Sequence, residues 1–289
     1  MRFTFLGTGS PVPSLRRSGP AHAVRDEAGR VLLIDCGPGV ARQCVGAGID
    51  LAAIEALVVT HLHSDHMSEF AHLATAAWHA GRDRPWRVYA PEPVLEALRG
   101  QMRALEGEIT LRLAHEARGR EDAFQIDAQP LQEKERFSCG GLEIEPFCVD
   151  HRPVEPAFGL IFRESGRKLC FSGDTRPVAA MVEAARGADL LVHEVVAFDE
   201  APVAGGRRAE TLARVSAYHS TPEEVGRIAH EAGVKALALT HIVPPDADGA
   251  RLLARLRGTY QGPAILGEDF MEIDLAARQL GSRGFHFAW

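Results

Sequence analysis

Lysine is scarce in this sequence of 289 residues: only Lys134, Lys168 and Lys235 are present, so arginine supplies 29 of the 32 basic side chains. Acidic side chains number 39, which gives a formal net charge of -7. Because the neutralisation of phosphates dominates affinity for nucleic acids, this balance argues against a protein whose main task is to bind a polyanion. A local basic patch is still compatible with it.

Long apolar runs and paired cysteines are also missing. The sequence contains no run of 18 uncharged apolar residues, about the length that is needed to span a membrane. The residues before Gly7 are too few for the apolar region of a signal peptide. The five cysteines are odd in number and include no C-x-x-C pair. We therefore expect buried, reduced thiols, a cytoplasmic location and no membrane partner.

Short apolar runs alternate with turns and helical segments, which is typical of an α/β fold. The first series predicts strands at 3–6, 21–25, 31–34, 55–59 and 87–90 and helices at 39–48, 67–80 and 93–105. The second predicts strands at 142–149, 157–162, 168–172, 189–192, 236–240, around 265 and at 271–273, and helices at 177–186, 207–217, 222–232 and 251–257. We expect one domain over residues 1–289, made of two similar halves, with a surface insert near 106–129 that is irregular from residue 109 onward.

Four potential metal ligands lie within six residues, directly after the predicted strand that ends at Val59: His61, His63, Asp65 and His66. In an extended segment, side chains two residues apart point to the same side, so His61 and His63 can share one metal ion. Without a cation, so many titratable groups close together would repel one another or be costly to desolvate. The run therefore predicts a metal site.

Three further candidate ligands end other apolar strands: His151, Asp174 and His241. Each lies where a strand stops and a loop begins, the edge at which α/β proteins gather their sites. A single histidine in such a place is more often a satisfied core or surface residue, but the run at His61 favours a ligand role here. Zinc, iron and manganese all suit these ligands. We predict two sites, the first with His61, His63 and His151, the second with Asp65, His66 and His241, and Asp174 between them.

In these motifs the chain resembles the metallo-β-lactamase superfamily: the H-x-H-x-D-H run, the later His151, Ser172-Gly173-Asp174-Thr175 and Thr240-His241. The resemblance extends over nearly the whole chain and implies a four-layer αβ/βα sandwich. It also implies a dinuclear hydrolase with two Zn²⁺ ions, or Mn²⁺ or Fe²⁺ in their place, and often a homodimer. In such a centre Asp65 would orient the attacking water, and Asp35 would hold a ligand imidazole.

Two further segments, His193-Glu194 and His219-Ser220-Thr221, resemble motifs of the ribonuclease Z branch, which trims the 3′ ends of transfer RNA precursors. The resemblance places Glu194 beside His219. A carboxylate that is hydrogen-bonded to an imidazole favours the charged ring and raises its pKa. His219 would then be a general acid, with Glu194 as its catalytic partner.

The bacterial enzymes of this branch carry a long substrate-gripping arm between the two residues that correspond to His151 and Asp174, which only 22 residues separate here. The segment from Ile242 to Pro245 also replaces a polar, arginine-containing turn. Relatives without the arm include arylsulfatases and small-molecule phosphodiesterases. We therefore predict a metal-dependent hydrolase of a phosphodiester, sulfate ester or related ester in a small-molecule substrate, with nucleic acid as the less favoured partner.

Two alternatives remain open. A binding or structural protein that has lost catalysis would have a broken ligand set, whereas all seven positions are filled here. Processing of the transfer RNA 3′ end, as by ribonuclease Z, predicts an arginine-rich face. The candidates for that face are Arg16, Arg17, Arg82, Arg84, Arg87, Arg207 and Arg208.

Overall fold

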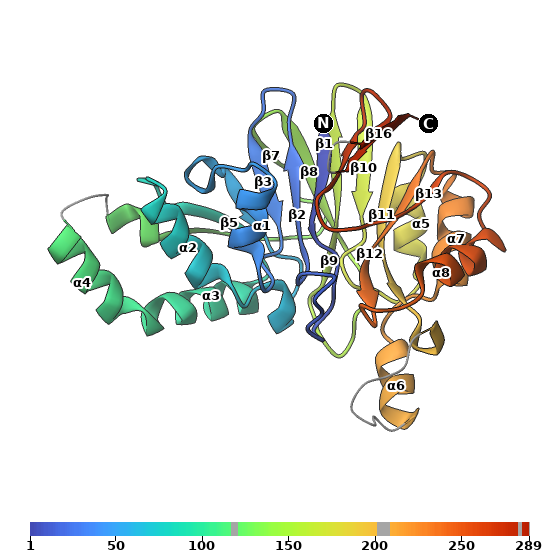
Figure 1. Cartoon of the computed structure of the whole chain (residues 1–289), viewed down its shortest axis with the longest axis horizontal. Coiled ribbons are helices and arrows are strands. Elements are labelled where there is room, and N and C mark those ends of the chain that lie inside the picture. Colours follow the sequence, from blue (N-terminus) through green and yellow to red (C-terminus); the bar gives the residue numbers. More distant parts are fainter. Residues whose placement is uncertain (117–120, 201–208, 283–284, 289) are drawn as a thin grey trace.

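Two β-sheets form the centre of the computed structural model, which describes residues 1–116, 121–200, 209–282 and 285–288 (Figure 1). The larger sheet has the order β16 (Phe285–Ala288), β15 (Gln279–Ser282), β14 (Met271–Asp274), β1 (Arg2–Gly7), β2 (Ala21–Arg25), β3 (Val31–Ile34), β4 (Ala56–Val58), β5 (Trp86–Ala90) and β6 (Ile126–Pro130). The smaller sheet has the order β13 (Ala264–Leu266), β12 (Leu237–Val243), β11 (Leu190–Val196), β10 (Arg167–Phe171), β9 (Phe158–Glu164), β8 (Leu142–Cys148) and β7 (Phe137–Cys139).

Helices cover the outer faces of both sheets (Figure 1). On the larger sheet lie α1 (Val40–Gly46), α2 (Phe70–His79) and α3 (Glu92–Ala104), with α4 (Glu106–Glu116) extending beyond them. On the smaller sheet lie α5 (Ala179–Ala185), α7 (Pro222–Ala232) and α8 (Gly249–Arg257), while α6 (Ala209–Ser216) projects away from the body. Short 3₁₀ turns occupy Leu51–Ala53, Ser64–His66, Glu121–Phe124 and Phe198–Glu200.

Three apolar layers hold this arrangement together. Phe3 and Leu32 of the larger sheet meet Phe162 and Leu169 of the smaller sheet in a core between the sheets. A second core lies under α1 to α3, and a third under α5, α7 and α8. Since one core lies between the sheets and one lies under the helices on each outer face, the predicted four-layer αβ/βα sandwich is confirmed.

The prediction that residues 109–129 are irregular is wrong for most of this segment. Residues 106–116 form helix α4, whose Ile109 is buried with Trp78 and Phe124. The charges that suggested a loop are a helix surface, because Arg112 pairs with both Glu108 and Glu116, four residues away on either side. Residues 126–130 form β6, parallel to β5, and residues 117–120 lie outside the described part of the chain.

Strands β7, β15 and β16 were also not predicted. They are short segments of mixed composition that are ordered by pairing with neighbours, and such pairing leaves little trace in local sequence. Among the described residues, no helix is both long and apolar enough to cross a membrane. All five cysteines are free.

Candidate metal centre

Three imidazole nitrogens converge beyond the end of β4. Nε2 of His61 lies 3.1 Å from Nδ1 of His63, which in turn lies 3.1 Å from Nε2 of His151. His61 and His151 are fully buried, and His63 is half-buried. Tetrahedral zinc with bonds of about 2.0–2.1 Å would hold its nitrogens roughly 3.3 Å apart. The observed spacing therefore suits three ligands of one metal ion.

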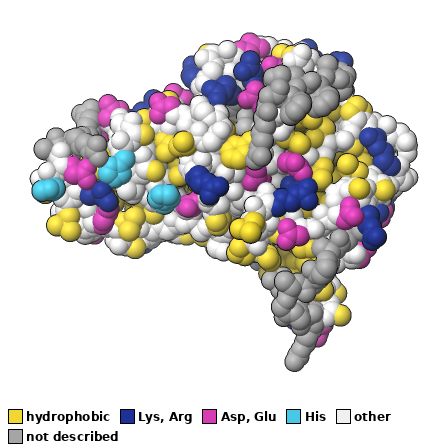
Figure 2. All heavy atoms as spheres, viewed as in Figure 1, with side chains coloured by type: hydrophobic (Ala, Val, Ile, Leu, Met, Phe, Trp, Pro, Cys, Tyr) yellow, Lys and Arg dark blue, Asp and Glu magenta, His cyan; other side chains and the backbone are white. Residues whose placement is uncertain are grey.

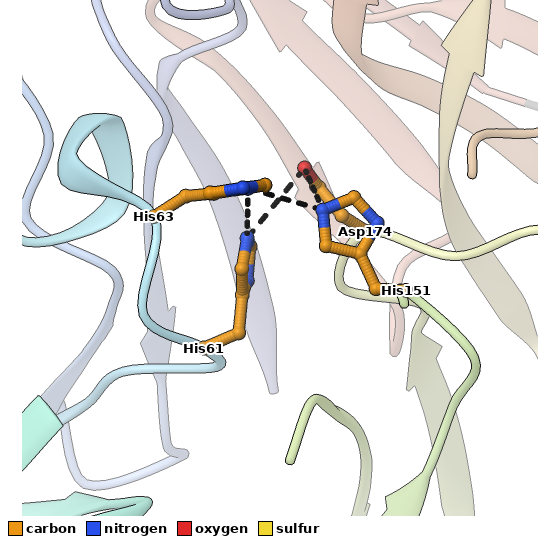
Figure 3. A group of neighbouring side chains, drawn as sticks. All are labelled: His61, His63, His151 and Asp174. Carbon is orange, nitrogen blue, oxygen red and sulfur yellow. Dashed lines mark hydrogen bonds and ion pairs between the residues drawn. The ribbon is translucent and has the colours of Figure 1, made fainter. Parts of the chain in front are cut away.

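Asp174 faces this group from the end of β10 (Figure 3). Its Oδ2 lies 3.8 Å from Nε2 of His61 and 3.8 Å from Nε2 of His151. The same oxygen lies 3.4 Å from Nε2 of His66 and 3.3 Å from Nε2 of His241. One carboxylate oxygen thus faces two groups of imidazoles, as a bridging ligand would.

The second group contains Asp65, His66 and His241, all buried. Oδ2 of Asp65 lies 3.6 Å from Nε2 of His66 and 3.4 Å from Nε2 of His241. Nδ1 of His66 donates to Asp35 at 2.8 Å, the contact that the resemblance implied for Asp35. Nε2 of His66 is buried and has no hydrogen-bond partner in the described part of the chain. It faces Asp65 and Asp174, and a cation placed between them would find all three as ligands.

Unusual backbone geometry positions the side chains of His241 and Asp174. Glu194 pairs with Thr240 and Val195 pairs with Ile242, so His241 is the extra residue of a bulge in β12, and its φ is 41°. Bulges next to active sites re-aim a side chain, and φ values in this range are rare for residues other than glycine. Gly173, with φ of 59°, precedes Asp174, and a Cβ at that position would lie 2.5 Å from the carbonyl oxygen of Phe158.

The electrostatics of the centre favour cations. Burial lowers the pKa of His61 well below its usual range and that of His151 to about 4, so both rings are neutral, the form that binds metal. Burial opposes charge on His66 too, but nearby carboxylates, Asp174 above all, raise its pKa well above the usual value. The donor set therefore fits two divalent cations, since imidazoles and carboxylates are ligands of transition metals.

Glu194 of β11 and His219, just before α7, lie side by side next to this centre. Nδ1 of His219 donates to Oε1 of Glu194 at 3.0 Å, and the backbone N–H groups of Thr175 and Ser220 donate to the same oxygen at 3.1 and 3.2 Å. Burial alone would lower the pKa of His219, but the charge and hydrogen bond of Glu194 raise it. His219 offers a nitrogen within 4.8 Å of the ligand atoms of Asp174 and His241.

Two residues that the sequence motifs do not single out support the centre. Thr60 donates its backbone N–H, at 2.9 Å, and its hydroxyl, at 3.1 Å, to Oδ1 of Asp35. The carbonyl oxygen of Tyr218 accepts a hydrogen bond from Nδ1 of His151 at 3.0 Å, which leaves Nε2 toward the centre. Their one sequence signal is position, because each directly precedes a motif histidine.

The predicted arginine-rich face does not form among the described candidates. Arg17 is buried and donates to Thr8 and to two carbonyl oxygens, and Arg82 is buried over the ring of Trp86. The other three described candidates, Arg16, Arg84 and Arg87, each pair with a carboxylate. Figure 2 likewise shows basic and acidic side chains interspersed on the face that it draws. Arg207 and Arg208 lie outside the described residues.

Comparison with known proteins places the chain in a family. Residues 30–242 match the model of the β-lactamase superfamily domain. Ribonuclease Z of Mycobacterium marinum is 32% identical over 291 residues, which cover 96% of this chain and 100% of that protein. The chain belongs to the ribonuclease Z-like branch of the metallo-β-lactamase superfamily. Ribonuclease Z of Mycobacterium sp. strain KMS is 34% identical over 282 residues, covering 94% of this chain and 95% of the relative.

Solved structures of the superfamily share the fold. Human tRNase Z, short form, is 25% identical with a TM-score of 0.69, covering 95% of this chain and 99% of that one. The metallo-β-lactamase fold protein YhfI from Bacillus subtilis has a TM-score of 0.74 over 94% of this chain and 98% of its own, at 18% identity, which supports the fold alone. The family match, the alignment with ribonuclease Z and the groups of histidine and aspartate side chains together support a metal-dependent hydrolase.

The predicted preference for a small-molecule substrate over nucleic acid is wrong. The relatives that match nearly the whole chain are ribonucleases Z, and a ribonuclease acts on RNA. The prediction relied on the net charge of -7, on the segment from Ile242 to Pro245 and on the missing arm between His151 and Asp174. Because the alignment with the M. marinum protein spans 291 residues and covers nearly all of both chains, that relative has little room for a long arm either. A short segment here is therefore compatible with the ribonuclease Z branch.

Proposed function

We propose that this protein is a metal-dependent endoribonuclease that cleaves a phosphodiester bond at the 3′ end of transfer RNA precursors. The observation that carries the proposal is a centre in which one oxygen of Asp174 faces two groups of ligands, in a chain that aligns over 96% of its length with a ribonuclease Z. Two cations suit a phosphodiester, because they can neutralise its charge and stabilise both the attacking and the leaving oxygen.

Two Zn²⁺ ions are the proposed cofactors. When bound, they would polarise the scissile phosphate and supply a water molecule of lowered pKa. Zinc suits the observed mixture of imidazole nitrogen and carboxylate oxygen, with Mn²⁺ or Fe²⁺ as alternatives. The proposed ligands are His61, His63 and His151 for the first ion, Asp65, His66 and His241 for the second, and Asp174 for both.

The proposed catalytic side chains are Asp65, His219 and Glu194. Asp65 accepts a hydrogen bond from the attacking water and so orients it towards the phosphorus atom. His219 delivers a proton to the leaving oxygen from Nε2, because Nδ1 is engaged by Glu194. Glu194 fixes the ring and stabilises its protonated form, while the N–H groups of Thr175 and Ser220 hold the carboxylate in place.

We place the reaction in the cytoplasm. All five cysteines are free, and four of them are buried. Thiols that remain unpaired fit a reducing compartment.

The direct test uses a precursor transfer RNA with a 3′ trailer and the zinc-loaded protein at physiological salt. We expect one endonucleolytic cut at the trailer, abolished by a chelator and restored by Zn²⁺. Asp174→Ala should abolish cleavage, because both groups of ligands lose their shared oxygen.

His151→Ala and His230→Ala form a matched pair of histidine variants. His151 is buried in the centre, whereas His230 is exposed on α7, so only the first should lose activity. Hydrolysis of a nitrophenyl phosphodiester without any cut in the precursor would refute the RNA substrate and leave the hydrolase assignment standing.

A further inference from the structure

Tyr218 lies at the rim of the candidate metal centre, between α6 and His219. Its ring centroid is 5.0 Å from that of His151, 4.8 Å from that of His219 and 6.4 Å from that of His63. The side chain is half-buried, so part of the ring faces solvent beside the proposed ligands and the proposed acid. The ring is therefore close enough to contact a substrate bound at the metal centre.

The contacts of the Tyr218 ring with neighbouring rings are edge-on or tilted. It meets His151 at 89°, His219 at 50° and His63 at 49°, so none of these rings is stacked parallel to its face. Within the described part of the chain, its hydroxyl has no hydrogen bond. The contact with Nδ1 of His151 uses the backbone carbonyl, which any residue at position 218 would supply.

The other two tyrosines differ in this respect. Tyr260 is 4% exposed, and its hydroxyl donates to the carbonyl oxygen of Val234. Tyr89 stacks on Phe137, with centroids 3.8 Å apart and an interplanar angle of 13°. Both therefore have a clear structural role, whereas the ring of Tyr218 presents an unstacked aromatic face at the rim.

We propose that Tyr218 is a specificity-determining residue whose ring stacks on a nucleobase next to the scissile phosphodiester. The inference rests on the proposed RNA substrate. Proteins recognise single-stranded RNA ends by stacking unpaired bases on aromatic side chains, and tyrosine is one of those used. Since a base is joined to its phosphate through one sugar, a phosphate at the metal centre brings the flanking base to this rim.

The experiment compares wild type, Tyr218→Leu and Tyr218→Phe on a precursor transfer RNA and on two copies of it, each with an abasic site at one of the nucleotides that flank the cut. Stacking predicts that Tyr218→Leu lowers kcat/KM on the intact RNA by about 5- to 150-fold, mainly through KM. Tyr218→Phe keeps the ring and should stay within about twofold of wild type. Both variants should retain two metal ions, because the carbonyl of residue 218 is unchanged.

The abasic substrates decide the mechanism. At one of the two flanking positions, removal of the base should lower the kcat/KM of wild type as much as the Tyr218→Leu substitution lowers it on the intact RNA. The same removal should lower the kcat/KM of Tyr218→Leu little further. The stacking role would be overturned if each abasic site lowered kcat/KM equally in wild type and in Tyr218→Leu. It would also be overturned if Tyr218→Phe lost as much kcat/KM on the intact RNA as Tyr218→Leu. Loss of metal from Tyr218→Leu would also overturn it, since the ring would then act through His151. If wild type cuts no precursor at all, the proposed function fails and the stacking role with it.

Discussion

At the scale of single residues, His219 is held in a way that separates catalysis from metal binding. One oxygen of Glu194 receives its Nδ1–H and two backbone N–H groups, so the ring is fixed without help from a metal ion. Nothing in this arrangement requires His219 to contribute to metal affinity. Removal of the ring should therefore affect turnover and spare the centre.

We expect His219→Ala to retain both metal ions and to lose about 10²- to 10⁴-fold in turnover, the usual contribution of a positioned acid. Glu194→Gln should lose less, because the ring stays in place but its protonated form is no longer stabilised. Elemental analysis and kcat on the precursor RNA measure the two effects. The deficit should shrink for nitrophenyl diesters, whose leaving groups need no proton. A variant that loses metal, or loses no activity, would contradict the assignment.

The burial of His22 lowers the stability of the folded state in acid. Its Nε2 lies 2.7 Å from Oγ1 of Thr240, and its ring packs against Phe3 and Phe171. Burial lowers its pKa to about 3, whereas in the unfolded chain it titrates near 6.5. Between these values the unfolded state binds one more proton, so this group reduces the free energy of unfolding as pH falls.

Between pH 7 and pH 5, we expect the free energy of unfolding to fall by about 2 kcal/mol less in His22→Phe than in wild type. Urea unfolding of the metal-free proteins at the two pH values measures this difference. The other buried histidines are present in both proteins, so the comparison isolates His22 together with its repulsion of His66 and His241. An identical pH dependence in the two proteins would show that His22 already binds a proton in the folded state.

At the scale of elements, the loop between β1 and β2 supports the strand that carries His241. Arg17 of this loop donates to the carbonyl oxygens of Gly267 at 2.7 Å and Pro245 at 3.1 Å, and to Oγ1 of Thr8 at 2.6 Å. The carbonyl oxygen of Thr8 accepts a hydrogen bond from the N–H of Ile242 at 3.0 Å. The buried guanidinium thus links this loop to Pro245 and, through Thr8, to Ile242, both on the C-terminal side of the bulge at His241.

We expect Arg17→Met to weaken metal binding at the group of His241 while the group of His61 keeps its ion, because only the first depends on this loop. Zinc titration against a competing chelator should show one tight ion where wild type binds two. Arg16→Met is the matched control, since Arg16 is exposed and pairs with Glu268. Two ions of unchanged affinity, or the loss of both together, would contradict this local role.

At the scale of the whole molecule, the proposed metal ions connect the two sheets. His61, His63, Asp65 and His66 follow β4 of the larger sheet. His241 lies in β12 of the smaller sheet, and His151 and Asp174 follow its strands β8 and β10. The two sheets also share one apolar core. That the chain unfolds as a single domain stays a prediction, and this core is the physical reason to expect it.

Chelation should lower Tm by roughly 5 to 15 °C, because a ligand at 1,000 times its Kd stabilises the folded state by about 4 kcal/mol. Differential scanning calorimetry should give a single transition with and without metal. In Asp174→Ala, chelation should shift Tm by much less. Two separate transitions would show that the sheets unfold independently, and an unchanged Tm would mean that no metal links them.

The sequence by itself determined the elements with strong local signals and the candidate ligands. Alternation of apolar runs and turns predicted most strands, because the period of a strand is visible within a few residues. The spacing of His61 and His63, and the position of His151, Asp174 and His241 at strand ends, predicted one shared edge. Local chemistry was sufficient there, since a metal site demands particular side chains at particular strand ends.

Only the tertiary structure decided features that depend on partners distant in sequence. Arg17 looks like a solvated cation until the carbonyl oxygens of Pro245 and Gly267 surround it. The charges of the α4 segment suggest a loop in the sequence, and only the packing of Ile109 against Trp78 shows why a helix forms there. Tyr218 has no pattern of its own, and its place beside His151 follows from two loops that meet 67 residues apart. Burial, pairing and contact across the fold are properties of the packed chain, and a local pattern of residues does not encode them.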